Sequence, residues 1–434
     1  MLIIIHSETN QHTIAQNLGR SEYSYYFVLK EYRPVLERLG RVIEVRDPAL
    51  EVDALYLECL ARGEPCVFLA FSPPHRTPIH LACPTLPVFA WEFSTIPNEA
   101  FDGEPRNDWR TVLQACGAAI THSSYTVNAV REAMGAAYPI VAVPAPVWDR
   151  FAARGAQLPG QPAGGPLQLT IKGLVADSRT LDLDAFGPKH LRRGKGIDFA
   201  APVTEHTLQL DGVVYTSVFN PSDGRKNWED MLSAFCVTFR EVEDATLVLK
   251  LTHHDAEEAL SDILHHLYKN QSYRCRIVLI YGYLADPDYE RLVQATRYVV
   301  NTSYGEGQCL PLMEFMSCGK PAVAPRTTAM IDYLNADNAF LIDSTDELTA
   351  WPHDPRKAFR TLRYVTNWAS LCVAYRDSYE VASRQPQRYA QMAAQAVASL
   401  QGFCSQAVAE QRLQDFLAQL FEQRAQAAMA AHGS

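Results

Sequence analysis

The feature that most constrains the fold is the repeated alternation of short apolar runs with stretches of helical periodicity. Short apolar runs joined by helices are typical of α/β domains with parallel sheets. In the first half the predicted strands are Leu2–Ile5, Val42–Val45, Cys66–Ala70, Val88–Trp91, Ala118–Thr121 and Ile140–Val143. In the second half they are Val213–Phe219, Ala245–Leu251, Arg276–Tyr281, Tyr298–Thr302 and Pro321–Ala324. Because the pattern occurs in both halves, we predict two consecutive Rossmann-like domains.

A compositional change separates the two halves. Residues 155–166 are rich in Gly and Pro, which is typical of a loop, and the stretch that follows lacks clear periodicity. We therefore predict a first domain over residues 1–205, with an irregular linker from about residue 150, and a second domain over residues 206–385. Apolar residues then recur at helical spacing, which predicts that residues 386–434 form helices packed on the body.

Composition excludes several classes of protein. The net charge is −10, which argues against general affinity for nucleic acid. No apolar run approaches the roughly 18–20 residues that a membrane helix needs. The 10 cysteines form no CxxC pair and no cluster with zinc spacing, so we expect reduced, buried thiols in a cytoplasmic protein.

One segment, residues 298–324, has the order strand, loop, helix, turn, strand. Pro311 suits the first turn of a helix, and Gly319 followed by Pro321 suits its end. The loop between strand and helix would then lie at the carboxyl end of a parallel strand, where α/β sheets bind ligands. The free N–H groups of the helix start favour phosphate.

Two glutamates, Glu306 and Glu314, stand eight residues apart in this segment. With the residues around them they form the sequence EGQCLPLMEFMSCGKPAV. This sequence resembles the donor-site motif of retaining GT-B glycosyltransferases, the GT4-like family that includes bacterial α-mannosyl- and α-glucosyltransferases. The resemblance implies that Glu306 faces the hydroxyls of the transferred sugar. It also implies that Glu314 accepts hydrogen bonds from both ribose hydroxyls, which suits an acceptor-only carboxylate.

The same resemblance assigns Gly307, Gln308, Cys309 and Leu310 to the donor-binding loop. The family usually has Phe and Gly where this chain has Gln308 and Cys309. A cysteine there places a side chain beside the amides that would bind phosphate. This departure keeps an alternative open, namely a GT-B homologue that binds a nucleotide sugar without turnover.

A second motif, FNPSDGRKNW, spans residues 219–228 at a predicted strand-to-helix junction. Its pair Arg225–Lys226 resembles the RKN element of the same family, which implies that these two residues clamp the donor diphosphate and neutralise the departing nucleotide. Cations at a helix start oppose the helix dipole, so an anion is expected to offset them.

Candidates in the first half are fewer. Gly19 lies in the loop after the first strand, where a glycine would let the backbone approach the diphosphate. Glu92 follows the predicted strand Val88–Trp91 and is expected at the cleft, facing the acceptor or the transferred sugar. His75 and His122 are alternatives for that acceptor-side role.

The remaining motifs favour neither a metal site nor a dinucleotide enzyme. Two DxD pairs, Asp182–Asp184 and Asp286–Asp288, lack the context of metal-dependent transferases, so we predict no metal and no cofactor. No GxGxxG follows a predicted strand, which argues against a Rossmann dehydrogenase.

The resemblance as a whole implies a fold and an activity. The fold would be α/β with the GT-B architecture: two Rossmann-like domains facing an interdomain cleft, with C-terminal helices. The activity would be retaining transfer of a sugar from a nucleotide-diphosphate sugar to a glycan or lipid-linked acceptor, in bacterial surface polysaccharide synthesis. A lipid-linked acceptor leaves open a peripheral contact with the inner face of the membrane.

Overall fold

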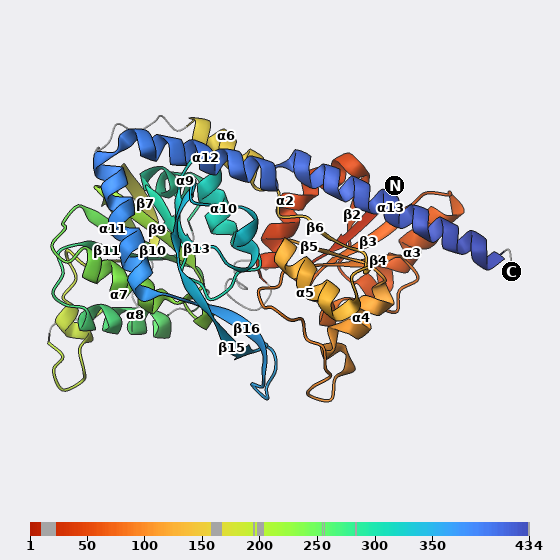
Figure 1. Cartoon of the computed structure of the whole chain (residues 1–434), viewed down its shortest axis with the longest axis horizontal. Coiled ribbons are helices and arrows are strands. Elements are labelled where there is room, and N and C mark those ends of the chain that lie inside the picture. Colours follow the sequence, from red (N-terminus) through yellow and green to blue (C-terminus); the bar gives the residue numbers. More distant parts are fainter. Residues whose placement is uncertain are drawn as a thin grey trace.

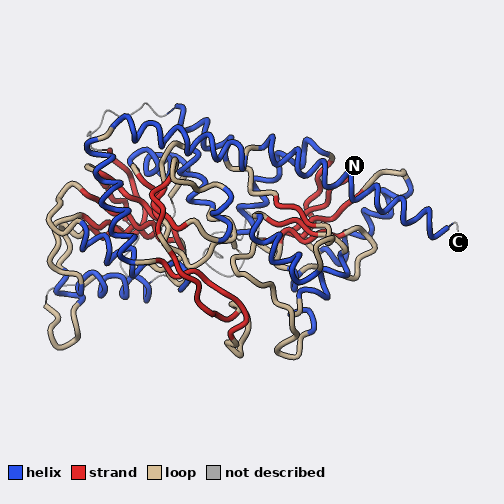
Figure 2. The backbone as a smooth tube through the Cα atoms, in the orientation of Figure 1, coloured by secondary structure: helices blue, strands red, loops and turns tan. Residues whose placement is uncertain are grey.

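The computed structural model describes residues 1–9, 23–157, 167–193, 196–197, 204–253, 255, 257–282 and 284–432. It consists of two α/β domains that lie side by side, with long C-terminal helices crossing from one to the other (Figure 1). Each domain is built on its own sheet, and the tube view separates the two groups of strands clearly (Figure 2).

The first sheet has six parallel strands in the order β2-β1-β3-β4-β5-β6. The strands are β1 (Leu2–His6), β2 (Arg41–Glu44), β3 (Cys66–Phe71), β4 (Thr85–Phe89), β5 (Ala119–Thr121) and β6 (Ile140–Ala142). The helices are α2 (Ser24–Leu39), α3 (Pro48–Ala61), α4 (Trp109–Cys116), α5 (Ser124–Met134) and α6 (Trp148–Gln157). Central strands are buried on both faces, which explains their continuous apolar sequence.

The second sheet has eight strands in the order β14-β13-β12-β9-β10-β11-β7-β8. Its parallel strands are β9 (Val213–Phe219), β10 (Ala245–Leu251), β11 (Arg276–Tyr281), β12 (Tyr298–Val300), β13 (Ala322–Pro325) and β14 (Ala339–Ile342). The helices of this domain include α7 (Trp228–Thr238), α8 (Glu257–Lys269), α9 (Asp286–Ala295) and α10 (Leu310–Ser317). The predicted strand-helix alternation is therefore confirmed in both halves.

The boundary between the domains differs from the prediction. Strands β7 (Leu167–Asp177) and β8 (Thr204–Leu210) form an antiparallel hairpin at the edge of the second sheet, where β7 pairs with β11. Residues 167–177 and 204–205, which we assigned to the first domain, therefore belong to the second sheet. The sequence signal was weak because polar residues such as Gln168 and Lys172 interrupt the apolar ones along this edge hairpin.

A second hairpin and three helices complete the chain. Strands β15 (Ser344–Ala350) and β16 (Phe359–Thr366) pair with each other and reach from the second domain toward the first (Figure 1). Helices α11 (Trp368–Arg384), α12 (Pro386–Cys404) and α13 (Gln406–His432) follow, which confirms the predicted C-terminal helices. Helix α13 crosses back onto the first domain, where Glu410 pairs with Arg38 of α2 at 2.6 Å.

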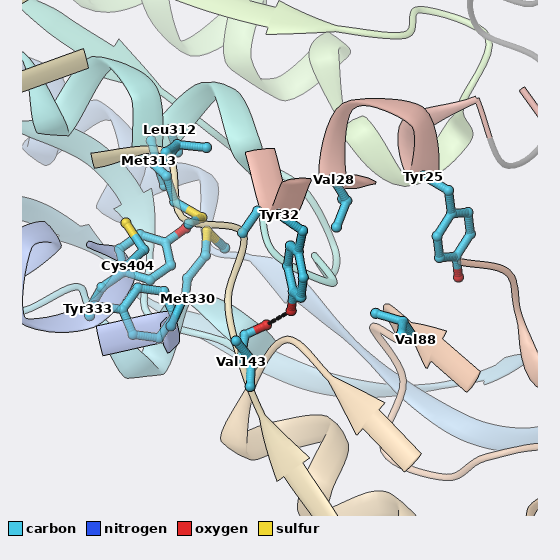
Figure 3. Close-up of a cluster of buried hydrophobic side chains, with 14 of the residues drawn as sticks. Tyr25, Val28, Tyr32, Val88, Val143, Leu312, Met313, Met330, Tyr333 and Cys404 are labelled. Carbon is cyan, nitrogen blue, oxygen red and sulfur yellow. Dashed lines mark hydrogen bonds between the residues drawn. The ribbon is translucent and has the colours of Figure 1, made fainter. Parts of the chain in front are cut away.

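Buried side chains from both domains form one hydrophobic cluster (Figure 3). Tyr25 and Tyr32 on α2 belong to it, as do Met313 on α10 and Tyr333. Tyr32 also donates a hydrogen bond to the carbonyl of Val143. The two domains therefore share a close-packed core.

Candidate active site

A cavity of about 1540 Å³ lies between the two domains. Its first-domain wall includes Trp91 and Glu92, which follow β4. Its second-domain wall includes Arg225 and Lys226 after β9, and the start of α10. The cavity thus lies at the carboxyl ends of parallel strands, where the sequence predicted a ligand site.

The loop after β12 holds the carboxylate of Glu306 in place. Asn301 Nδ2 and Ser303 Oγ both donate to Glu306 Oε1, at 3.0 and 2.6 Å. The Glu306 backbone N–H donates to Thr328 Oγ1 at 2.9 Å. Only 4% of Glu306 is exposed, so these bonds leave its side chain little freedom to move.

The turn after β9 brings two cations to this carboxylate. Asp223 caps the turn by accepting from the Arg225 backbone N–H, and its other oxygen pairs with Arg225 Nε at 2.9 Å. Lys226 Nζ lies 2.7 Å from Glu306 Oε1, and an Arg225 terminal nitrogen lies 3.6 Å from Glu306 Oε2. Asn227, in the left-handed region with φ 49°, then starts α7.

The charges of this cluster determine the protonation of Glu306. Burial alone would raise the pKa of Glu306, but Lys226 and Arg225 outweigh burial and lower the pKa to about 2. Burial lowers the pKa of Lys226, but Glu306 outweighs burial, so the pKa of Lys226 is raised above its usual value. All three groups are therefore ionised at neutral pH.

Glu92 lies across Arg225 from Glu306. One terminal nitrogen of Arg225 is 3.1 Å from Glu92 Oε1 in the first domain and 3.6 Å from Glu306 Oε2 in the second. Burial raises the pKa of Glu92, and Arg225 counteracts part of that rise. Glu92 thus lines the cavity at the position expected from the sequence, and it is joined to the second domain by an ion pair.

Two glycines let the loop after β12 approach the first domain closely. A Cβ on Gly305 would lie 2.8 Å from the Glu92 carbonyl oxygen, and a Cβ on Gly307 would lie 2.7 Å from the Ala90 Cβ. Contacts this short exclude a side chain at either position. The glycines of the YGEG sequence therefore serve the contact between domains as well as the loop itself.

The residues that depart from the family motif have defined contacts. Gln308 Oε1 accepts a hydrogen bond from the Ala145 backbone N–H across the domain boundary, at 2.7 Å. Cys309 precedes α10 in the left-handed region, with φ 63°, and its sulfur accepts from Asn301 Nδ2 at 3.1 Å. A conformation that suits glycine explains why the related motif has Gly there. Leu310 begins α10 and also lines the cavity.

Glu314 lies on α10, farther along the same cavity. Tyr289 on α9 donates to Glu314 Oε2 at 2.6 Å. Burial raises the pKa of Glu314 to about 7, although the Tyr289 hydrogen bond lowers it. Arg150, which also lines the cavity, pairs instead with Glu31 at 2.8 Å and with Asp286 at 3.3 Å.

The other first-domain candidates are not part of this cluster. Gly19 lies outside the described residues. His122 is fully buried and its Nδ1 contacts the Val143 carbonyl at 2.9 Å, so it supports the first-domain core. The His75 ring stacks on Trp109 at 5.9 Å and contacts the His353 ring at 5.6 Å. Of the three acceptor-side alternatives, Glu92 is the one that contacts Arg225.

The two DxD pairs have structural partners. Asp182 accepts from the Asp184 backbone N–H at 3.1 Å, and Asp286 pairs with Arg150 and Arg154. Within the described part of the chain, no group of three or more His, Cys, Asp or Glu side chains is arranged to hold a metal ion. None of the described helices combines the length and apolarity needed to cross a bilayer.

Sequence reasoning missed several residues that shape the cavity. Asp223, Asn301, Ser303 and Tyr289 hold the named cations and carboxylates in position. Asn301 and Ser303 could have been found, because they are polar residues directly after a buried strand. Tyr289 could not, because its partner Glu314 lies on a different helix.

Comparison with known proteins agrees with this geometry. Residues 212–351 match the family Glycosyl transferases group 1. No curated protein sequence matches the chain. Sucrose-phosphate synthase from Thermosynechococcus elongatus is similar in structure, with a TM-score of 0.56 at 13% identity over 97% of this chain and 99% of that one.

Two further structures span almost the whole chain. HepE from Anabaena, in complex with UDP and glucose, has a TM-score of 0.51 at 13% identity and covers 96% of this chain and 99% of its own. A glycosyltransferase from Rickettsia africae has a TM-score of 0.53 at 10% identity, covering 96% and 97%. These likenesses, with two Rossmann-like domains facing a cavity, show that the chain has the GT-B fold, and residues 212–351 resemble the group 1 glycosyl transferases.

Proposed function

We propose that this protein is a retaining, metal-independent glycosyltransferase of the GT4-like type, which transfers a sugar from a nucleotide-diphosphate donor to a glycan or lipid-linked acceptor. The observation that carries the proposal is the convergence of Arg225, Lys226, Glu306 and Glu314 on one interdomain cavity at the start of α10. A role in bacterial surface polysaccharide synthesis at the cytoplasmic side of the membrane suits such an acceptor.

The donor fits this arrangement by chemistry. The diphosphate would lie against the N–H groups at the start of α10 and against Arg225 and Lys226, which neutralise the negative charge that grows as the nucleotide leaves. Glu314 would accept the ribose hydroxyls, in place of the hydrogen bond from Tyr289. Gly307, Gln308, Cys309 and Leu310 would form the loop around the donor.

The transfer step needs no nucleophile from the protein. The acceptor hydroxyl attacks the anomeric carbon, the bond from that carbon to the diphosphate breaks, and a donor phosphate oxygen takes the acceptor proton. Attack on the face from which the diphosphate departs retains the anomeric configuration. Glu306 would hold the sugar hydroxyls, since Lys226 and Arg225 keep its carboxylate ionised.

Glu92 is proposed to act on the acceptor side. Its carboxylate lies in the first-domain wall, 3.1 Å from Arg225. Glu92→Gln should lower turnover with the acceptor at least tenfold while leaving nucleotide affinity within twofold, because Glu314 is untouched and Arg225 keeps its contacts with Asp223 and Glu306. Wild-type turnover in this variant would transfer the acceptor-side role to another group, with His75→Gln as the next variant to measure.

The decisive experiment is incubation of the protein with a panel of nucleotide sugars. UDP-sugars come first, because HepE was solved with UDP and glucose. We expect slow release of nucleotide diphosphate without acceptor. We also expect a product whose anomeric configuration, measured by NMR, is that of the donor. Nucleotide-sugar binding without any release would favour the non-catalytic alternative, and an inverted product would refute retention.

A further inference from the structure

A buried lysine that the proposed reaction does not use lies in the wall of the same cavity. Lys250 is the penultimate residue of β10, beside Val218 of β9 and Ile280 of β11. Only 6% of it is exposed, and the strand around it is otherwise apolar apart from Thr246. A charged residue there must be explained, because lysine is almost never fully buried unless it is paired.

Among the residues that the structure describes, Lys250 has no anionic partner. Its Nζ donates to the Leu251 carbonyl at 2.9 Å, and it forms no ion pair with any described residue. An ammonium has three donor hydrogens, so this one hydrogen bond leaves capacity for other acceptors. Desolvation by burial lowers the pKa of Lys250 to about 8. Arg225 and Lys226, by contrast, are each compensated by carboxylates.

The location points to a ligand as the missing partner. Side chains alternate along a strand, so Lys250 shares the face of Val248, which packs in the same cluster as Ile280 and Leu292 under α9. Helix α9 also carries Tyr289, which contacts Glu314. Lys250 therefore lies on the side of the sheet where the donor nucleotide would bind, and it lines the cavity that contains Glu314 and Lys226.

We propose that Lys250 is a further donor-binding residue, whose ammonium donates to an oxygen of the bound nucleoside diphosphate. This inference rests on the proposed function, since it names another contact of the same site. The acceptor is either a phosphate oxygen or a carbonyl oxygen of the base. Either oxygen would supply a second acceptor, which the described residues do not offer to the buried ammonium.

A second lysine, which is partly buried, provides a control. Lys320 also donates to a backbone carbonyl, that of Gln294 at 3.3 Å, and burial likewise lowers its pKa to about 8. It is not among the residues that line the cavity. The substitutions K250M and K320M therefore each remove a lysine that donates to a backbone carbonyl, and only the first removes it from the cavity wall.

The test is titration calorimetry of the full-length protein and both variants with UDP and GDP, together with their melting temperatures. K250M should weaken binding of the preferred nucleotide at least tenfold and leave the melting temperature equal or higher, because a buried charge is removed. K320M should bind within twofold of wild type. The corresponding nucleoside, uridine or guanosine, is titrated in the same way. If K250M loses affinity for the nucleoside by the same factor, Lys250 contacts the base. If K250M loses affinity for the diphosphate alone, Lys250 contacts the phosphates.

Other outcomes overturn the proposal. K250M with wild-type affinity, or K320M with an equal loss, would show that Lys250 does not contact the nucleotide. If K250M does not fold, K250Q is measured instead, and failure of both to fold would assign Lys250 a structural role. A wild-type protein that binds no nucleotide would refute the proposed function itself, whereas unchanged binding in K250M refutes only the role of Lys250.

Discussion

At the residue scale, the site is a set of ionisable groups held in unlike surroundings. Glu306 is surrounded by cations and donors, which lower its pKa to about 2, whereas burial raises the pKa of Glu314 to about 7. Both are glutamates of one motif, eight residues apart. Their environments therefore separate a permanently charged group from one whose charge changes near neutral pH.

Replacing Glu314 by Gln should weaken nucleotide diphosphate binding by about 1–3 kcal/mol, because the ribose hydroxyls lose a charged acceptor. Titration calorimetry measures this, with circular dichroism as the check that the fold is intact. Unchanged affinity in the folded variant would remove Glu314 from the ribose site.

The pKa of Glu314 also predicts a pH dependence. In the folded state its pKa is raised to about 7, so the folded protein binds a proton that the unfolded chain has lost between about pH 4.5 and 7. Stability from this group is therefore present at low pH and is lost as pH rises through 7. Nucleotide affinity should change in the opposite direction, rising as the carboxylate forms. Nucleotide affinity is measured between pH 6 and 8 for the wild type and for Glu314→Gln. The difference between the two affinities isolates the effect of Glu314, since titration of the nucleotide affects both proteins.

Replacing Arg225 or Lys226 by Ala should slow transfer more than tenfold, because both act on charge that develops in the transition state. Binding of the bare nucleoside should hardly change. Steady-state kinetics compare these variants with Lys269→Ala, which removes an exposed cation far along α8. A double variant with wild-type turnover would mean that other groups neutralise the leaving diphosphate.

At the scale of elements, two segments from the end of the chain tie the second domain to the first. Helix α13 packs on α2, and the β15–β16 hairpin contacts the loop after β4. There Thr361 Oγ1 accepts from the Thr95 backbone N–H at 3.1 Å, and Trp351 Nε1 donates to the Thr95 carbonyl at 3.2 Å. In Figure 1 α13 runs along the top of the two domains and the hairpin lies at the bottom, so the domains are joined at two separate places.

Helix α13 should be essential for stability although it contributes nothing to the cavity. Leu413 is fully buried, so Leu413→Ala should lower the free energy of unfolding by about 2–5 kcal/mol. The matched control is Leu348→Ala on the β15–β16 hairpin, where the leucine is 60% exposed and the change should be within about 0.5 kcal/mol. Chemical denaturation measures both. Equal losses of unfolding free energy in the two variants would mean that the face of α13 that carries Leu413 does not anchor the helix.

At the scale of the whole molecule, the cavity exists because two separately built sheets present their carboxyl ends to each other. The Arg225–Glu92 ion pair and the Gln308–Ala145 hydrogen bond cross between the domains at its walls. If a diphosphate binds as proposed, Arg225 and Lys226 would neutralise its charge and the N–H groups at the start of α10 would donate to it, without a metal ion.

Transfer should therefore continue in excess EDTA, within twofold of the untreated rate. The measurement is release of nucleotide diphosphate with and without chelator, followed by addition of manganese or magnesium. Activity that disappears with EDTA and returns with either ion would make the phosphate site metal-dependent and would direct attention to Asp182–Asp184 and Asp286–Asp288.

The sequence by itself determined the two α/β halves and the elements that carry the motifs. Strands Val213–Phe219, Ala245–Leu251 and Arg276–Tyr281 have the predicted bounds, because parallel strands covered on both faces are continuously apolar. The order of elements around Glu306 and Glu314 was also predictable, since Pro311 and Gly319 mark the two ends of one helix.

Only the tertiary structure decided where the less regular segments pack and which residues meet. The β7–β8 and β15–β16 hairpins mix polar and apolar residues, so their sequence shows neither their strand character nor the sheet they join. Glu92 meets Arg225, Tyr289 meets Glu314, and Lys250 lines the cavity because separate elements converge there. The physical reason is that local sequence encodes the burial pattern of one element, whereas contacts and pKa values depend on how distant elements pack together.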